Sequence, residues 1–223
     1  MNIGLVGLKG VGKDTVAGIM KTVLEEQGYT VELHKFADTL KDMTRNVFGA
    51  TFDDRDVKEE RVFVTPELYN AMIDELDKLD MLMRLSPLGS ETMWDIIEDV
   101  LLQRTWISPR EFQQLVGTDV ARAMNLNVWV DIAKAKVDHN NINIFTDVRF
   151  GNELLDKNVL IVRDEVTPSS DEGLHVSEKL AYDMTIVDVS RDYYKLYNNC
   201  NIKSLELKVR MMLSVIMRGV DHD

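Results

Sequence analysis

The first residues that could do chemistry form a glycine-rich stretch near the start of the chain. Gly7, Gly12 and Lys13 stand at the spacing G-x-x-x-x-G-K, between an apolar stretch at 2–6 and residues with helical spacing. Glycines let the backbone curl so that successive N–H groups point inward, and a helix start adds partial positive charge. A lysine ammonium there reaches the outer oxygens of a phosphate chain. The pattern predicts a phosphate-binding loop (P-loop), with contacts from Gly7, Lys9, Gly10, Val11, Gly12, Lys13, Asp14 and Thr15.

The position after Lys13 departs from the usual pattern. A Ser or Thr hydroxyl commonly contacts Mg²⁺ there, whereas this chain has Asp14 followed by Thr15. Either Thr15 supplies a phosphate contact from the next position, or Asp14 approaches the metal, directly or through water. Asp147 is a further candidate for a magnesium-water contact, because it follows the apolar stretch 142–146, and the alternative is a carboxylate that caps the end of a strand.

Hydrophobic spacing predicts the elements that must position these groups. A strand at 2–6, a helix ending near Gly28 and a strand at 31–36 make a βαβ unit, which implies a parallel sheet. Further strands are expected at 142–146, 159–162 and 184–187, with a short helix at 150–157 and a last helix at 204–218. These elements predict an α/β fold with a doubly wound, mainly parallel five-stranded sheet.

Helical signals also fill the stretch between the second and third predicted strands. Asp38 is expected to cap a helix that ends at Gly49, and Thr65-Pro66-Glu67 begins a helix that runs to about Arg84. Ser108 and Glu111 form a capping box at the start of another. Residues 50–107 are therefore expected to form a helical insertion within a single domain of residues 1–223. The dense charge run at 53–61 is interpreted as a solvated face.

Several cations follow predicted strands, where ligands bind in an open α/β sheet. Arg149 could grip a phosphate with two parallel N–H donors, or pair with Glu153. Arg163 opens the polar loop 164–178, whose size suits a lid that closes on a ligand and brings in a cation. Lys41 and Arg45 lie four residues apart on one predicted helix face, and either meet a phosphate or form a solvated face.

Composition excludes several classes of function. The chain has 223 residues, with 26 Lys+Arg against 38 Asp+Glu and a net charge of −12, so a broad surface for nucleic acid is not expected. Cys200 is the only cysteine, which excludes an intrachain disulfide framework and a multi-cysteine zinc site and fits a reducing interior. No apolar run approaches the roughly 20 residues of a membrane span, and no basic start precedes an apolar stretch, so no membrane association is expected.

Six short motifs resemble, in their order along the chain, those of the bacteriophage deoxynucleoside monophosphate kinases, within the P-loop nucleoside monophosphate kinase-like group. They are Gly-Lys-Asp-Thr (12–15), Phe-Ala-Asp-Thr-Leu-Lys (36–41), Gly-Thr-Asp (117–119), Trp129, Asp-Val-Arg-Phe-Gly-Asn-Glu (147–153) and His-Val-Ser-Glu (175–178). The resemblance spans roughly residues 1–49 and 108–190, and residues 50–107 do not contribute. The family usually has Pro where Thr39, Gly151 and Val176 stand here, which affects loop stiffness rather than charged groups.

The resemblance implies transfer of the γ-phosphoryl group of ATP to a deoxynucleoside monophosphate, with Mg²⁺ as cofactor. The catalytic groups that it implies are Lys13, Asp147, Arg149 and Arg163, with Asp14, Thr15 and Asp147 towards the metal. The residues implied for the acceptor are Ala37, Asp38, Lys41, Arg45, Arg110, Gln113, Gly117, Thr118, Asp119, Trp129, Arg149, Glu153, His175 and Glu178. For Trp129 we favour core packing over stacking on a base. The resemblance also implies a cytoplasmic protein, in an infected host cell if phage-encoded, and leaves a homodimer or a monomer open.

Two rival interpretations remain. A P-loop kinase of another small acceptor, such as a coenzyme A precursor, fits the P-loop and the Phe-Ala-Asp start loosely. A nucleotide-hydrolysing switch or ATPase needs only the P-loop. The extra cations after several strands favour a kinase, because an acceptor phosphate needs them.

Overall fold

The computed structural model describes residues 1–54, 56–84, 91–167, 174, 176–186 and 193–218, and its chain divides into two compact units. Unit 1 is formed by Met1–Phe36 and Lys136–Asp223, and unit 2 by Ala37–Ala135. The chain leaves unit 1 after its second strand and returns before its third, so unit 2 is inserted in the sequence of unit 1. This unit begins earlier and ends later than the predicted insertion at 50–107.

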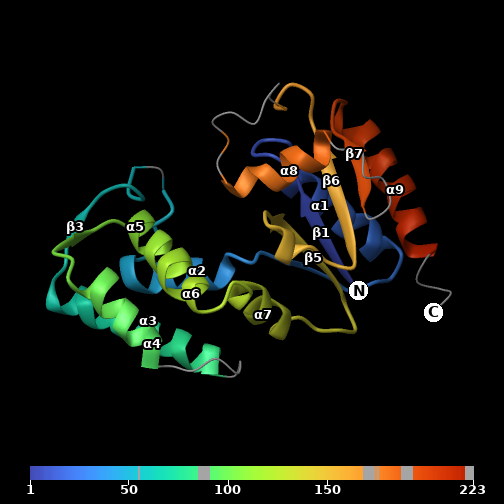
Figure 1. Cartoon of the computed structure of the whole chain (residues 1–223). Helices are drawn as coiled ribbons and strands as arrows, with labels where there is room; N and C mark the ends of the chain where they lie inside the picture. Colours follow the sequence, from blue (N-terminus) through green and yellow to red (C-terminus); the bar gives the residue numbers. More distant parts are fainter. Residues whose placement is uncertain (55, 85–90, 168–173, 175, 187–192, 219–223) are drawn as a thin grey trace. The chain divides into compact units, whose positions relative to one another are not determined.

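Unit 1 is built on a five-stranded sheet in which all neighbouring strands are parallel (Figure 1). In spatial order its strands are β2 (Val31–His34), β5 (Ile142–Val148), β1 (Asn2–Val6), β6 (Lys157–Val162) and β7 (Tyr194–Tyr197). Ile3 pairs with Ile144 on one side and Lys157 on the other. Every residue of β5 is buried, as a parallel sheet with both faces covered requires.

Helices cover both faces of this sheet. Helix α1 (Lys13–Glu26) packs against β1, β2, β5 and α9 (Ile202–Arg218), whereas α8 (Val176–Ile186) packs against β6. The crossover through α1 runs along the sheet in one direction, from β1 to β2, and the crossover through α8 runs in the other, from β6 to β7. Right-handed crossovers therefore place α1 and α8 on opposite faces, as Figure 1 shows.

The structure confirms the α/β class and the five-stranded parallel sheet, and it corrects two predicted elements. The fifth strand is β7, because residues 184–186 of the predicted strand at 184–187 form the last turn of α8. Thr185 is satisfied in that helix, since its hydroxyl donates to Ala181 O at 2.7 Å. The predicted helix at 150–157 is only a 3₁₀ turn, Gly151–Glu153, and β6 already begins at Lys157.

Unit 2 is mainly helical. Its helices are α2 (Asp38–Phe48), α3 (Pro66–Arg84), α4 (Glu91–Ile97), α5 (Pro109–Gln114), α6 (Ala121–Met124) and α7 (Val128–Ala135), with π-helical segments at Glu98–Leu102 and Leu115–Val120. A short antiparallel pair, β3 (Val62–Phe63) and β4 (Trp106–Ile107), is an addition that the sequence patterns do not predict. An apolar core that includes Met72, Leu76 and Phe112 holds these elements together.

Local signals fix the helix ends of unit 2. Ser108 accepts a hydrogen bond from the Glu111 N–H, and the Glu111 carboxylate accepts one from the Ser108 N–H, so the predicted capping box is confirmed. Gly49 ends α2 with a φ of 91°, again as predicted. In the part of the chain that the structure describes, no helix combines the length and apolar character needed to cross a bilayer.

Candidate phosphate-binding site

The glycine-rich loop joins β1 to α1 in unit 1, and its glycines are needed for two reasons. Gly10 and Gly12 have φ angles of 88° and 93°, which side chains disfavour. In addition, a Cβ on Gly12 would lie 2.5 Å from Asn198 Nδ2, and one on Gly7 would lie 2.8 Å from Ile161 O. Asn198 supports the loop from the end of β7, because its Nδ2 donates to Val11 O at 2.8 Å. Backbone conformation and close packing therefore both require the predicted glycines.

Lys13 begins α1 and folds back over this loop. Its Nζ donates to Gly7 O at 2.6 Å and to Leu8 O at 3.0 Å. Burial lowers the pKa of Lys13 below the usual 10.5, and the neighbouring Arg149 charge lowers it further, while nearby acids act in the opposite direction. A half-buried ammonium beside a guanidinium is a costly arrangement that a bound anion would relieve. The electrostatics of Lys13 therefore favour an anionic ligand.

Asp147 lies near the carboxyl end of β5, next to this loop. Its side chain is buried, and its Oδ1 accepts a hydrogen bond of 2.8 Å from the Phe36 N–H, in the segment that follows β2. The carboxylate therefore ties together the ends of two neighbouring strands. The sequence predicts this position at the end of a strand. The hydrogen bond to Phe36 is a strand-end cap, which is the alternative given above to a magnesium-water contact.

The turn after β5 presents Arg149 to solvent. Glu153 is buried, and its Oε2 accepts from the backbone N–H groups of Arg149 at 2.7 Å and Phe150 at 3.2 Å. Glu153 thus positions the backbone that carries Arg149, which is a different contact from the predicted alternative of a side-chain ion pair. Among the described residues, none forms an ion pair with the Arg149 guanidinium. That guanidinium is available for an anion near Lys13.

The predicted metal groups have different environments. Within the described ranges, no three or more His, Cys, Asp or Glu side chains are arranged to hold a metal ion. Mg²⁺ at phosphoryl-transfer sites needs only one or two carboxylates, because phosphates and waters complete its shell. Asp147 fits this need, whereas the Asp14 side chain is 82% exposed and pairs with Lys35 at 3.3 Å. Thr15 is exposed and borders a groove of about 480 Å³ beside α1 and α9.

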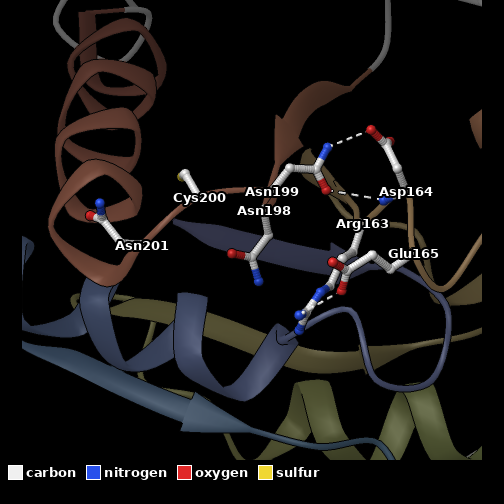
Figure 2. Close-up of a pocket in the computed structure, with 7 residues that line it drawn as sticks. All are labelled: Arg163, Asp164, Glu165, Asn198, Asn199, Cys200 and Asn201. Carbon is white, nitrogen blue, oxygen red and sulfur yellow. Dashed lines mark hydrogen bonds and ion pairs between the residues drawn. The ribbon is translucent and has the colours of Figure 1, made fainter.

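A cavity of about 520 Å³ opens beyond the carboxyl ends of β6 and β7 (Figure 2). Its lining comprises Arg163, Asp164 and Glu165 after β6, and Asn198, Asn199, Cys200 and Asn201 after β7. Asn199 joins the two sides, because it accepts from the Asp164 N–H at 3.0 Å and donates to Asp164 Oδ2 at 2.7 Å. Asn198 lines the cavity and also donates to Val11 O in the glycine-rich loop, so the cavity lies next to that loop.

Sequence reasoning found Arg163 but missed the Asn198–Asn201 side of this cavity. Because the fifth strand is predicted at 184–187, the polar run after Tyr197 does not stand at the end of a strand in that prediction. The usable signal is the sequence Tyr-Lys-Leu-Tyr followed by three asparagines among four residues. Strand-forming residues before a polar run mark a ligand-binding strand end in an α/β sheet.

The acceptor residues implied by the resemblance lie mainly in unit 2, where the cations have partners. Lys41 pairs with Asp53 at 2.8 Å, Arg45 with Asp42, and Arg110 with Glu59. Hydrogen bonds from Lys41 and Lys58, of which the bond from Lys41 has the larger effect, lower the pKa of Asp53 to about 2. For Lys41 and Arg45, such exposed ion pairs agree with the alternative given above, in which these residues form a solvated face. Ala37 is the N-cap of α2 and Asp38 is its first helical residue, so the predicted capping role of Asp38 is wrong.

The predicted residues Gly117, Thr118 and Asp119 lie in the π-helical segment Leu115–Val120. Such segments are rare, and many occur at functional sites. Trp129 is 4% exposed, and its indole Nε1–H donates to Gly117 O at 3.0 Å, which is the core role that we favour for it. Gln113 Nε2, two residues before this segment, is buried without a hydrogen-bond partner among the described residues.

The last group of predicted residues belongs to the loop 164–178. Residues 168–173 and His175 lie outside the described residues, and residues 176–178 form the first turn of α8. Glu178 accepts a hydrogen bond of 3.0 Å from the Lys9 N–H, so it contacts the P-loop itself. The site in unit 1 thus brings together the P-loop, Asp147, Arg149 and Glu178.

No family model matches this chain, and no curated protein matches it. The case for its function therefore comes from its own residues.

Proposed function

We propose that the protein is a P-loop kinase that transfers the γ-phosphoryl group of ATP to a deoxynucleoside monophosphate, giving the diphosphate and ADP. The observation that carries this proposal is the arrangement around Lys13. A half-buried ammonium lies over a glycine loop and beside Arg149, at the carboxyl edge of a parallel sheet. The strand order, with β1 central and its loop leading into α1, supports a P-loop kinase-like fold.

The donor nucleotide fits the features of unit 1. Its phosphates would lie along the loop amides and the start of α1, where N–H groups and the helix dipole favour anions. The adjoining cavity of about 520 Å³ would hold the nucleoside, and its asparagine side chains offer donors and acceptors to a base. Arg163 lines that cavity and donates to Glu165 Oε2 at 3.0 Å (Figure 2). This ion pair is exposed, so a phosphate could compete for the guanidinium, which would add positive charge.

Phosphoryl transfer requires little covalent chemistry from the protein. Lys13, Arg149 and Arg163 would offset the charge that spreads over the transferred group. Asp147 would hold Mg²⁺ through a water, and the bound ion would offset phosphate charge. The role of the remaining residues is to align donor and acceptor and to exclude water.

The choice of acceptor rests on the resemblance of the short motifs. Lys41, Arg45 and Arg110 are the proposed cations for the monophosphate. Their ion pairs are exposed, and exposed pairs contribute little, so a phosphate dianion can compete with the carboxylates that now hold them.

The deciding experiment measures ADP formation from Mg-ATP with each deoxynucleoside and ribonucleoside monophosphate in turn. We expect a large increase over the ATP-only rate for at least one deoxynucleotide. ATP hydrolysis that no monophosphate changes would instead indicate an ATPase. A response only to another small acceptor would overturn the choice of substrate and keep the kinase.

A further inference from the structure

The first turn of α8 places a carboxylate on the P-loop. Glu178 Oε1 lies 3.0 Å from Lys9 N, although the two residues are 169 positions apart in sequence. Both belong to unit 1. This contact joins the end of the polar loop after β6 to the loop after β1, and it uses one of the backbone donors of the proposed phosphate site.

A carboxylate at this position resembles a phosphate oxygen in charge and in hydrogen bonding. Both are anionic acceptors for a backbone N–H. Glu178 also lies close enough to Lys13 to raise the pKa of that lysine, against the larger effect of burial. Its negative charge therefore acts on the same groups that are proposed to receive the donor phosphates.

We propose that Glu178 is an internal competitor for the donor phosphates. In the unliganded chain it holds the Lys9 amide, and a triphosphate has to displace it. The released carboxylate also frees the first turn of α8 from the P-loop, so nucleotide binding is coupled to the position of that turn. This inference rests on the proposed nucleotide-binding role of the P-loop.

Two other roles for Glu178 predict different results. If the carboxylate contacts a bound substrate, its neutralisation weakens binding. If it only stabilises the start of α8 through the helix dipole, its neutralisation lowers stability and leaves the affinity for phosphates unchanged. Competition alone makes the neutral variant bind more tightly.

The experiment is a calorimetric titration of the full chain with ATP, and separately with inorganic tripolyphosphate, in Mg²⁺-free buffer at pH 7. Glu178→Gln keeps an oxygen acceptor for the Lys9 N–H and removes the charge. We expect it to bind both probes about three- to tenfold more tightly than the wild type, because the hydrogen bond that a phosphate displaces is then neutral instead of charge-assisted. The factor should be the same for both probes, because the base is not involved.

Glu67→Gln is the matched control. Glu67 lies in the first turn of α3, so this change also removes one negative charge from a helix start, but in unit 2. It should leave both affinities unchanged. Glu178→Ala is the second variant, and circular dichroism checks that each variant is folded.

Unchanged or weaker binding by both Glu178 variants, with a wild type that binds, overturns the competition and leaves the kinase proposal intact. Equal gains in Glu67→Gln would also overturn it, because net charge would then explain the effect. Failure of the wild type to bind ATP or tripolyphosphate would overturn the proposed function together with this inference.

Discussion

Lys13 and Arg149 in unit 1 lie in a different environment from the proposed acceptor cations of unit 2. Arg163 of unit 1 is like the latter, because it pairs with Glu165 at 3.0 Å. In unit 1 burial lowers the pKa of Lys13 and the Arg149 charge lowers it further, and no described residue forms an ion pair with the Arg149 guanidinium. In unit 2 Lys41, Arg45 and Arg110 each pair with a carboxylate. Adjacent cations that repel each other favour an anionic ligand, whereas a paired cation is already neutralised. A basic residue in the sequence therefore indicates a phosphate site only where no carboxylate of the folded chain already pairs with it.

The largest effect is expected for Lys13, which begins α1 and lies over the glycine-rich loop. Lys13→Met should lower turnover at least about 10²–10³-fold, because one preorganised positive charge at the transferred group is lost. The free energy of unfolding should change by no more than about 1 kcal/mol, since two hydrogen bonds are lost together with a half-buried charge. Coupled ADP assays and urea unfolding measure the two quantities. Retained turnover would contradict the proposed role of the P-loop.

A second substitution compares the units directly. Arg149→Ala should lower kcat/KM about 10²-fold, whereas Lys41→Ala should raise the KM for the monophosphate about tenfold with little effect on kcat. The difference arises because Arg149 is expected to contact the transferred group and Lys41 only the bound acceptor. Initial rates at varied monophosphate concentration provide both constants. A larger loss from Lys41→Ala would reverse the comparison.

The third test concerns the shape of the loop. Gly12→Ala should weaken ATP binding about tenfold, because alanine is strained at a φ of 93° and its Cβ would meet Asn198. Gly18→Ala is the control, since Gly18 lies within α1 and a methyl group there would have no neighbouring atom within 4 Å. That control should keep ATP affinity and stabilise the helix by about 0.5–1 kcal/mol. Titration with ATP and urea unfolding separate the two outcomes.

The smallest effect belongs to the ion pairs of unit 2. Hydrogen bonds from Lys41 and Lys58 lower the pKa of Asp53 from 3.8 to about 2, so the ionised form is favoured in the folded chain. Its contribution to stability is therefore present above about pH 4 and is lost as pH falls towards 2. Asp53→Asn should be slightly less stable than the wild type at pH 6, and the difference should shrink as pH falls towards 2 and disappear below it. Urea unfolding across this range would contradict the assignment if the difference were independent of pH.

Local signals made much of the fold predictable. The glycine-rich turn between β1 and α1, the capping box at Ser108 and the glycine that ends α2 all depend on a few adjacent residues, and each forms as the sequence predicts. The error at 184–187 has a different origin, because an apolar, β-branched stretch is compatible with both a strand and a helix. Packing of α8 against the sheet decides between them, and that contact is not local.

The candidate site was predictable to the extent that its residues follow strands. Asp147 and Arg149 follow β5 as expected, whereas Asn198 was missed together with β7. The partner of Arg110 could not be predicted, because its ion pair with Glu59 joins residues 51 positions apart. The π-helical segment at 115–120 has no distinctive composition, and the Trp129 contact to Gly117 O is seen only in the folded chain.

The strand order has a consequence for synthesis on the ribosome. β1 and β2 are made first, but β5 lies between them in the sheet and begins only at residue 142. At about 5–20 residues per second, the missing strand emerges roughly 5–20 s after β2. Throughout that interval Ile3, Leu5 and Val31, which are buried in the finished protein, have no sheet to join, while the contiguous stretch 37–135 can complete its own contacts. The nascent segment that carries β1 and β2 therefore exposes apolar side chains until β5 emerges.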